Sequence, residues 1–287
     1  MAVGDTGDFA GSLQEVIADS MVHFSKANVC LPLVTVQARD KADTVTFPTY
    51  NLGSDTVTSA DVGAWTEHDS TAITATALDS VKKTATLDMY AVRCPVHDET
   101  MLSSADNPSD VVGQLVGNAI GAKVDNLIVA NFGNFANTSN DTSNGISVDD
   151  LFTAMGTLQA NSAPAPYSMV HNPRAIWGAY GLSNDLVTSN QFGGSPTAQD
   201  EMLKTGFIGA LAGMDIYTTP EIAISSDNAI GAVFSKMALG FAYAGQLINV
   251  EIERDAVRLK TDYVGSIFAG TVEIADTYGV ELTHKVQ

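Results

Sequence analysis

Three short motifs in the sequence match those that carry the reaction in serine β-lactamases and penicillin-binding proteins. Ser80-Val81-Lys82-Lys83 fits S-x-x-K, Ser226-Asp227-Asn228 fits S-D-N and Lys204-Thr205-Gly206 fits K-T-G. In those enzymes S-D-N precedes K-T-G, but here the order is reversed. Their nucleophilic serine also opens a buried helix, whereas Ser80 lies in a Thr- and Ala-rich pattern typical of a strand. We therefore expect no enzyme and no catalytic residue.

The sequence offers one group of side chains that could bind a metal ion. Cys94, His97, Asp98 and Glu99 lie close together and could supply mixed ligands. Pro95 interrupts this run, and the acidic end is typical of a solvated turn. No other histidine pair has metal-ligand spacing, and no phosphate-binding glycine motif follows a strand. We therefore expect no metal site and no cofactor.

Composition bounds the class of protein. The 287 residues are enough for one large domain or two modest ones, and a hydrophobic content of 45% supports a substantial core. Only 16% of residues are charged, which is compatible with a subunit that buries much surface against neighbours. The net charge of -19 argues against a basic reader of nucleic acid. Solubility, or adaptation to a salty medium, would also explain this charge.

The cysteines and the apolar segments indicate a compartment. Cys30 and Cys94 are too few for a disulfide framework, so we expect free thiols in a reducing cytoplasm. The first residues show no basic segment followed by an apolar one, so no secretory signal is predicted. The most apolar window, 229–250, contains polar residues and three glycines, which favours core strands over a membrane span.

A long arm is the main architectural feature of the first hundred residues. Thr44–Tyr50 and Thr84–Tyr90 alternate Thr, Val, Leu and aromatic residues, which predicts strands. The segment 51–83 between them is rich in Ser, Thr, Asp, Ala and Gly and has too few large apolar residues for a core of its own. Such an arm is expected to lie on another molecule.

A long helix is predicted after this arm. Asn107 is a suitable N-cap and Pro108 suits the first helical position. The run 111–132 then carries apolar residues at helical spacing. Gly113, Gly117 and Gly121 share one face, and each costs about 1 kcal/mol relative to Ala. We therefore expect a neighbouring element to approach this face closely.

The remaining chain alternates helices with short strands, which predicts an α+β fold. An amphipathic helix is expected within 13–24, and the polar cluster 136–147 is predicted to be a turn that forms the clearest internal boundary. Ser147 is the expected N-cap of a helix over 148–161. Strands are predicted at 167–170, 214–218, 229–234, 240–244, 250–253 and 269–274.

These elements, in this order, resemble the major capsid protein of tailed bacteriophages, which has the HK97-like fold. The resemblance implies that roughly Asp43 to Val96 is an extended β-hairpin, the E-loop, and that Asn107 to Phe135 is the spine helix. Downstream, Val170-His171-Asn172-Pro173 with Trp177, the segment 209–217 and the charged strand 250–254 also resemble family segments.

The resemblance implies five ranges along the chain. They are an N-terminal arm (1–42), the E-loop (43–96), a peripheral domain with the spine helix (97–144), an axial domain (145–246), and return strands of the peripheral domain with a C-terminal tail (247–287). It also implies a structural protein that self-assembles into pentamers and hexamers of an icosahedral shell enclosing phage DNA. The same fold leaves an encapsulin-like nanocompartment shell as the alternative, and a tail or decoration protein as a further rival.

The expected partners are other copies of the chain, scaffold and portal proteins, and packaged double-stranded DNA bound without sequence specificity, with a decoration protein as an open alternative. No membrane partner is expected, and the location would be the virion, assembled in the host cytoplasm. No lysine or asparagine matches the cross-linking residues of some relatives, so no covalent cross-link is expected. The start of the family-like region within about 30 residues implies a separate scaffold.

Five residues are predicted as subunit-interface candidates. Trp65 and Glu67 lie near the tip of the implied E-loop, and Gly113, Gly117 and Gly121 lie on the spine helix. Each also has an ordinary explanation. The first two fit an exposed aromatic side chain with a solvated acid, and the glycines fit helix–sheet packing within one chain.

Overall fold

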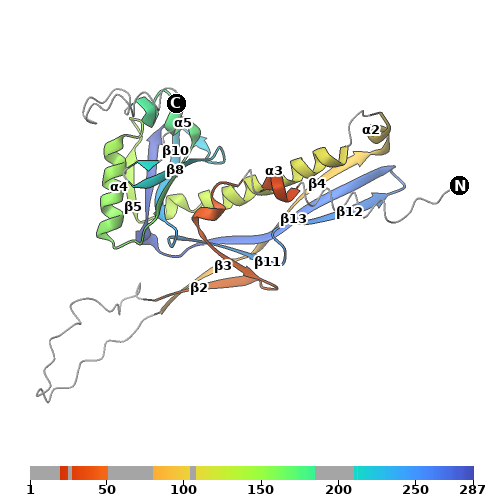
Figure 1. Ribbon diagram of the computed structural model, residues 1–287, viewed down its shortest axis with the longest axis horizontal. Coiled ribbons are helices and arrows are strands. Elements are labelled where there is room, and N and C mark those ends of the chain that lie inside the picture. Colours follow the sequence, from red (N-terminus) through yellow and green to blue (C-terminus); the bar gives the residue numbers. More distant parts are fainter. Residues whose placement is uncertain (1–19, 25–27, 51–79, 104–107, 185–209, 212) are drawn as a thin grey trace, which may run out of the picture.

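The computed structural model describes residues 20–24, 28–50, 80–103, 108–184, 210–211 and 213–287. Trp65, Glu67 and the Lys204–Gly206 motif therefore lie outside the described residues. The elements form two sheets joined by a long helix, with a separate two-stranded hairpin (Figure 1). This arrangement is the α+β architecture that the sequence predicts.

A five-stranded sheet forms one half of the molecule, and its central strand is β13 (Lys260–Glu273). The first part of β13 pairs with β12 (Asn249–Asp255), and its last part pairs with β11 (Leu239–Ala244). Its other edge pairs with β4 (Asp88–His97), and β1 (Thr35–Arg39) extends the sheet in parallel with β11. One 14-residue strand thus organises the whole sheet.

The long helix α3 (Pro108–Val129) packs along this sheet (Figure 1). Its buried side chains recur with helical spacing and form one apolar stripe. A close approach is possible because β13 has Gly265 under the helix, where an added Cβ would lie 2.3 Å from Cγ1 of Val116. The stripe consists of Val112, Val116, Ile120, Val124 and Ile128.

A seven-stranded sheet forms the other half. Its strand order is β5-β14-β10-β6-β8-β7, and β9 pairs with β10. The helix α4 (Val148–Ala160) covers it, and Ser147 and Asp150 form a reciprocal capping box at its start. The short helix α5 (Pro173–Trp177) follows β6. The strands are β5 (Asn137–Asp141), β6 (Tyr167–His171), β7 (Ala210–Leu211), β8 (Met214–Thr218), β9 (Ile224–Ser225), β10 (Asn228–Ser235) and β14 (Gly279–Lys285).

A two-stranded hairpin projects from the body (Figure 1). Its strands are β2 (Thr44–Tyr50) and β3 (Ser80–Thr86), and Phe47 and Leu87 belong to a small second core with Ile274. The remaining elements are η1 (Leu31–Leu33), α2 (Asp98–Ser103), η3 (Phe132–Asn134) and η4 (Asp276–Tyr278).

Two local predictions differ from the structure for the same reason. The cluster 136–147 was expected to be a turn, but its first part is the edge strand β5, which pairs in parallel with β14. Likewise, β13 begins at Lys260, well before the predicted strand 269–274. In both cases a partner distant in sequence supplies the hydrogen bonds, and local propensity is a weak guide to such pairing.

The sheet pairing also cuts across three of the ranges that the resemblance implied. The strand β4 lies in the range 43–96 but pairs with β13, and β11 lies in the range 145–246 but belongs to the same five-stranded sheet. The strand β14 lies in the range 247–287 but pairs with β10. The five ranges themselves stay a prediction.

Candidate assembly surfaces

The turn between β12 and β13 lies with α2 at one end of the molecule, opposite the seven-stranded sheet (Figure 1). We call this turn (residues 255–260) together with α2 (Asp98–Ser103) the hairpin tip, which belongs to the β12–β13 hairpin and not to the projecting β2–β3 hairpin. Its backbone is fixed by Asp255, whose Oδ1 accepts hydrogen bonds from the N–H groups of Val257 (3.1 Å) and Arg258 (3.2 Å). The tip is therefore a defined turn that presents its side chains in one geometry.

Leu259 adopts a left-handed backbone conformation at the end of this turn, with φ +49°. A non-glycine residue in this region costs about 1–2 kcal/mol. The side chain does not repay this cost inside the chain, because 61% of the residue is exposed. A strained and exposed leucine indicates a role outside the folding of the isolated chain.

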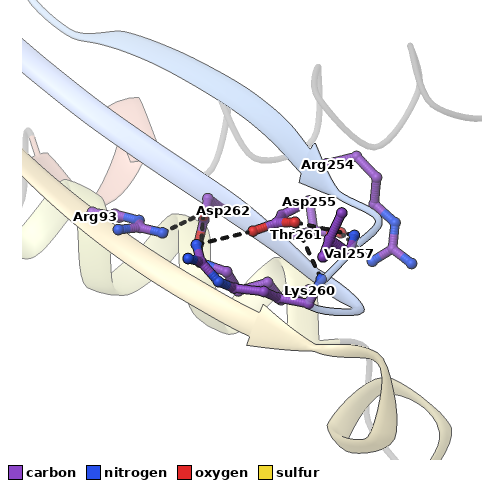
Figure 2. Close-up of polar contacts among 8 residues, drawn as sticks. Arg93, Arg254, Asp255, Val257, Lys260, Thr261 and Asp262 are labelled. Atoms are coloured by element: carbon purple, nitrogen blue, oxygen red, sulfur yellow. Dashed lines mark hydrogen bonds and ion pairs between the residues drawn. The ribbon is translucent and has the colours of Figure 1, made fainter.

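An ion-pair chain supports the base of the hairpin tip (Figure 2). Arg93 of β4 approaches Asp262 of β13 to 2.5 Å, and Nζ of Lys260 lies 2.9 Å from the same carboxylate. The Lys260 and Asp262 side chains are only 9% and 7% exposed. The hydrogen bond from Arg93, followed by that from Lys260, lowers the pKa of Asp262. The carboxylate therefore stays charged and holds the two strands in register.

A second ion pair attaches α2 to the β12–β13 hairpin. Both terminal nitrogens of Arg254 lie 2.5 Å from the two carboxylate oxygens of Asp98, which is a bidentate arrangement. The N–H of Asp98 also donates to the carbonyl of Leu259 (3.0 Å). The hydrogen bond from Arg254 lowers the pKa of Asp98. The start of α2 is thus tied directly to the strained residue of the turn.

Large apolar side chains are exposed around these charges. Val257 is 95% exposed, Leu102 89% and Leu259 61%. Apolar side chains with a rim of charged groups are typical of surfaces that associate with another protein. The sequence analysis identified the charged strand but missed the tip. The available signal was the run Ala256-Val257-Arg258-Leu259, which is unusually apolar for a turn.

The predicted glycine face of α3 is buried, and part of its contact is made within the chain. An added Cβ on Gly117 would lie 2.4 Å from the carbonyl oxygen of Ser20 and 3.1 Å from the amide nitrogen of Phe24. Residues 20–24 are helical, so this glycine lets the N-terminal segment approach the helix backbone. Gly113 and Gly121 are also buried. A role for these glycines between subunits stays a prediction, as it does for Trp65 and Glu67.

A buried carboxylate on α3 joins three segments. Asp125 accepts hydrogen bonds from the N–H groups of Val29 (3.0 Å) and Cys30 (2.9 Å) and from the hydroxyl of Thr219 (3.3 Å). Burial raises the pKa of Asp125, although these hydrogen bonds oppose the shift. Burial, with the nearby Asp125, also raises the pKa of the Cys30 thiol, so this cysteine is poorly suited to act as a nucleophile.

Those residues suspected of chemistry that the structure describes have other places in the fold. Ser80 begins the strand β3, not a helix, and Ser226 and Asp227 form the tight turn between β9 and β10 with positive φ. Of the possible metal ligands, Asp98 is occupied by Arg254. Among the described residues, no group of three or more His, Cys, Asp or Glu side chains is placed to hold a metal ion.

No described helix is long and apolar enough to cross a membrane.

An apolar cavity of ≈ 490 Å³ lies between the N-terminal segment and the five-stranded sheet. Met21, at its rim, is 50% exposed and Val36 is 42% exposed. Its lining consists of Met21, Phe24, Asn28, Leu31, Pro32, Val36, Leu247 and Ile248.

Solved structures identify the fold. A structure of Mycobacterium phage Che8 matches with a TM-score of 0.66 and 18% identity, over 89% of this chain and 90% of that one. The capsid of cyanophage P-SCSP1u matches with a TM-score of 0.66 and 18% identity, over 89% and 87%. An encapsulin complex from Synechococcus elongatus matches with a TM-score of 0.60 and 11% identity, over 90% and 87%.

The class that these matches define is the HK97-like fold of phage capsid structures, so the fold prediction is confirmed. The likeness extends over about nine tenths of both chains in the phage structures. No protein-family model matches the sequence, and the comparison with curated proteins yields no relative.

Proposed function

We propose that this chain is a major capsid protein, a structural subunit that self-assembles into pentamers and hexamers of an icosahedral shell enclosing phage DNA. The observation that carries this proposal is the likeness to phage capsid structures over nearly the whole of both chains. The likeness extends over about nine tenths of this chain.

The hairpin tip supports the proposal as a contact surface between copies. Val257, Leu102 and Leu259 expose apolar area that the described residues leave uncovered. The ion pairs of Arg254 with Asp98 and of Arg93 with Asp262 tie α2 and β4 to the two strands of the turn, so less backbone has to be ordered when another subunit binds. Stability of the assembled shell would then come from many such contacts.

The charge of the chain is consistent with a container for DNA. A net charge of -19 disfavours strong attraction between the shell wall and a polyanion, which would hinder packing and release of the genome. We propose that the further partners are scaffold and portal proteins, with a decoration protein as an open alternative. The proposed location is the virion, with assembly in the host cytoplasm.

Electron microscopy combined with sedimentation velocity tests this proposal. Purified protein, alone and with a candidate scaffold, should form closed shells or rings of five and six. The variants Val257→Asp and Leu102→Asp should remain small oligomers while keeping the wild-type Tm. Met237→Asp is the matched control, because Met237 is 53% exposed but lies between β10 and β11, away from the tip. A uniform monomer under all conditions would overturn the proposal.

The fold also favours a second candidate, an encapsulin-like shell that encloses protein cargo. The match to the Synechococcus elongatus encapsulin covers 90% of this chain, so the described architecture suits either container. The contents of shells isolated from the native source would separate the two. Nuclease-resistant double-stranded DNA supports the capsid, whereas copurifying protein cargo without DNA supports the compartment.

A further inference from the structure

Two histidines are fully buried on either side of β10 in the seven-stranded sheet. His171 ends β6 and His284 lies in β14, and each is 0% exposed. His284 is opposite Ala229 of β10. The ring of His171 fills the space above Gly231, where an added Cβ would lie 2.3 Å from the ring carbon Cδ2. The two imidazoles thus replace apolar side chains in a core position.

The ring nitrogens of these two histidines form few hydrogen bonds. Nδ1 of His171 accepts a hydrogen bond from the N–H of Asn172 (2.8 Å), whereas the other ring nitrogen, Nε2, forms no hydrogen bond of good geometry among the described residues. The backbone of Leu282 is its neighbour and only partly opposes the lowering of the His171 pKa. Within the same part of the chain, Nδ1 of His284 has no partner, and its Nε2 has only a long contact of 3.4 Å with the carboxylate of Asp150. Buried polar atoms without partners are uncommon and costly in native proteins. Their presence here points to a role beyond packing.

Two carboxylates and one imidazole face His284. Oδ2 of Asp150, on α4, lies 3.4 Å from its Nε2, and Asp141 is its register partner on β5. The third group is the imidazole of His171 on β6. The strand β10, which lies between the two histidines, carries no ionisable side chain.

Both carboxylates are already engaged in local turns. Oδ2 of Asp150 accepts from the N–H (2.9 Å) and the hydroxyl (2.7 Å) of Ser147 in the α4 capping box. Asp141 accepts from the N–H groups of Ser143 and Asn144 (both 3.0 Å). While the histidines are neutral, the two carboxylates therefore accept hydrogen bonds from residues of their own turns.

We propose that the His284–His171 pair is an acid-sensitive switch, in which protonation of His284 recruits Asp150 and thereby loosens the start of α4 and the strand β14. Protonation turns Nε2 into a cationic donor that competes with Ser147 for the same carboxylate oxygen. Once His284 is charged, protonation of His171 becomes still less favourable, because two adjacent imidazolium groups would repel each other. The inference goes beyond shell formation and concerns the subunit alone.

The direction of the pH effect follows from burial. Desolvation lowers the pKa of both histidines, that of His171 to about 3, while Asp150 and Asp141 oppose the shift at His284. Because the unfolded chain then binds protons more readily than the folded one, stability is complete above the ordinary value of 6.5. It is lost progressively as the pH falls from 6.5 towards 3.

Hydrogen exchange with mass spectrometry at a series of pH values tests the switch. After correction for intrinsic exchange rates, peptides over 147–151 and 279–287 should lose protection on acidification before peptides from α3 do. His284→Gln should remove this local acid response, and His97→Gln, at an exposed histidine of β4, should leave it unchanged. An equal loss of protection in α3 and α4, or the same response in His284→Gln, would overturn the proposal.

A titration of the intact wild-type protein keeps the test decisive if His284→Gln fails to fold. The imidazole resonances of histidine-labelled protein should show two rings that stay neutral at a pH where free histidine is charged. Asp150→Asn should shift the protonation of His284 to still lower pH, because it removes the adjacent negative charge. Normal titration of both rings would overturn the proposal, and so would an unchanged titration of His284 in Asp150→Asn.

Discussion

The interior of the seven-stranded sheet and the hairpin tip treat charge in opposite ways. In the sheet, His171 and His284 are fully buried, and desolvation lowers the pKa of both, which keeps the rings neutral. At the tip, hydrogen bonds from Arg93 and Arg254 lower the pKa of Asp262 and Asp98, which keeps these carboxylates charged. The first region excludes charge, whereas the second region pairs each carboxylate with an opposite charge.

The two regions differ in the same sense in their apolar side chains. All five residues of β6 are buried, so their side chains are covered within the subunit. At the tip, apolar side chains such as Val257 and Leu102 remain exposed beside ion pairs that fix the backbone. The difference separates a region built for folding from one available for association. Changes in the first should affect subunit stability, and changes in the second should affect assembly.

The largest effect is expected from Gly231→Ala in the sheet. The added methyl group would lie 2.3 Å from the His171 ring and 2.7 Å from the carbonyl oxygen of Val170. Because the backbone cannot withdraw from a paired strand, we expect the free energy of unfolding to fall by about 3 kcal/mol. Urea denaturation of the unassembled subunit measures this change.

Gly156→Ala is the control for the same half of the molecule. Gly156 is an exposed residue of α4, and an added Cβ there would meet no atom within 4 Å. This substitution should stabilise the subunit by up to about 1 kcal/mol, because Ala favours the helix over Gly. Equal behaviour of the two variants would show that the His171 ring does not need the space above Gly231.

A somewhat smaller loss of stability is expected from Asp125→Ala, which lies in the body between the two regions. The N–H groups of Val29 and Cys30 and the hydroxyl of Thr219 would lose their buried acceptor. We expect unfolding to become easier by about 2–3 kcal/mol and the segment around Cys30 to become sensitive to protease. Asn126→Ala, at the next and exposed position of α3, should change neither property.

Leu259→Gly should separate stability from assembly at the tip. Glycine relieves the left-handed strain at φ +49° but adds entropy to the unfolded chain. These effects oppose each other, so the free energy of unfolding should stay within about 1 kcal/mol of wild type. The protein concentration needed for assembly should rise, because an exposed apolar contact is removed. An unchanged assembly threshold would place the contact surface elsewhere.

What the sequence could predict depended on whether the signal was local. The start of α4 was predictable because Ser147 and Asp150 are three residues apart and satisfy each other. The strand β5 was not, because its polar residues form a strand only when β14 supplies hydrogen bonds from the far end of the chain. Gly117 signalled a close approach correctly, but the sequence could not identify Ser20 as the contact.

The tip and the histidine pair were missed for different reasons. The tip left a local signal in the apolar run 256–259, and the exposure of Leu259 follows from the register of the consecutive strands β12 and β13. The burial of His284 left no local signal, because it follows from the place of His284 beside β10, a strand distant in sequence. The resemblance to a known family supplied the fold, whereas the ion pairs, the buried histidines and the strain at Leu259 became visible only in the three-dimensional structure.

The smallest effect is expected from Asp98→Asn, which tests whether the ion pair orders the tip. The hydrogen bond from Arg254 lowers the pKa of Asp98, so the pair is intact above the ordinary value of 3.8 and is lost as the pH falls below it. Asp98→Asn should therefore speed hydrogen exchange in α2 at neutral pH without changing the Tm, and added salt should reproduce part of the effect. Glu99→Gln removes the same charge from the same turn of α2, so exchange as fast as in Asp98→Asn would show that net charge, and not the bidentate contact with Arg254, orders the helix.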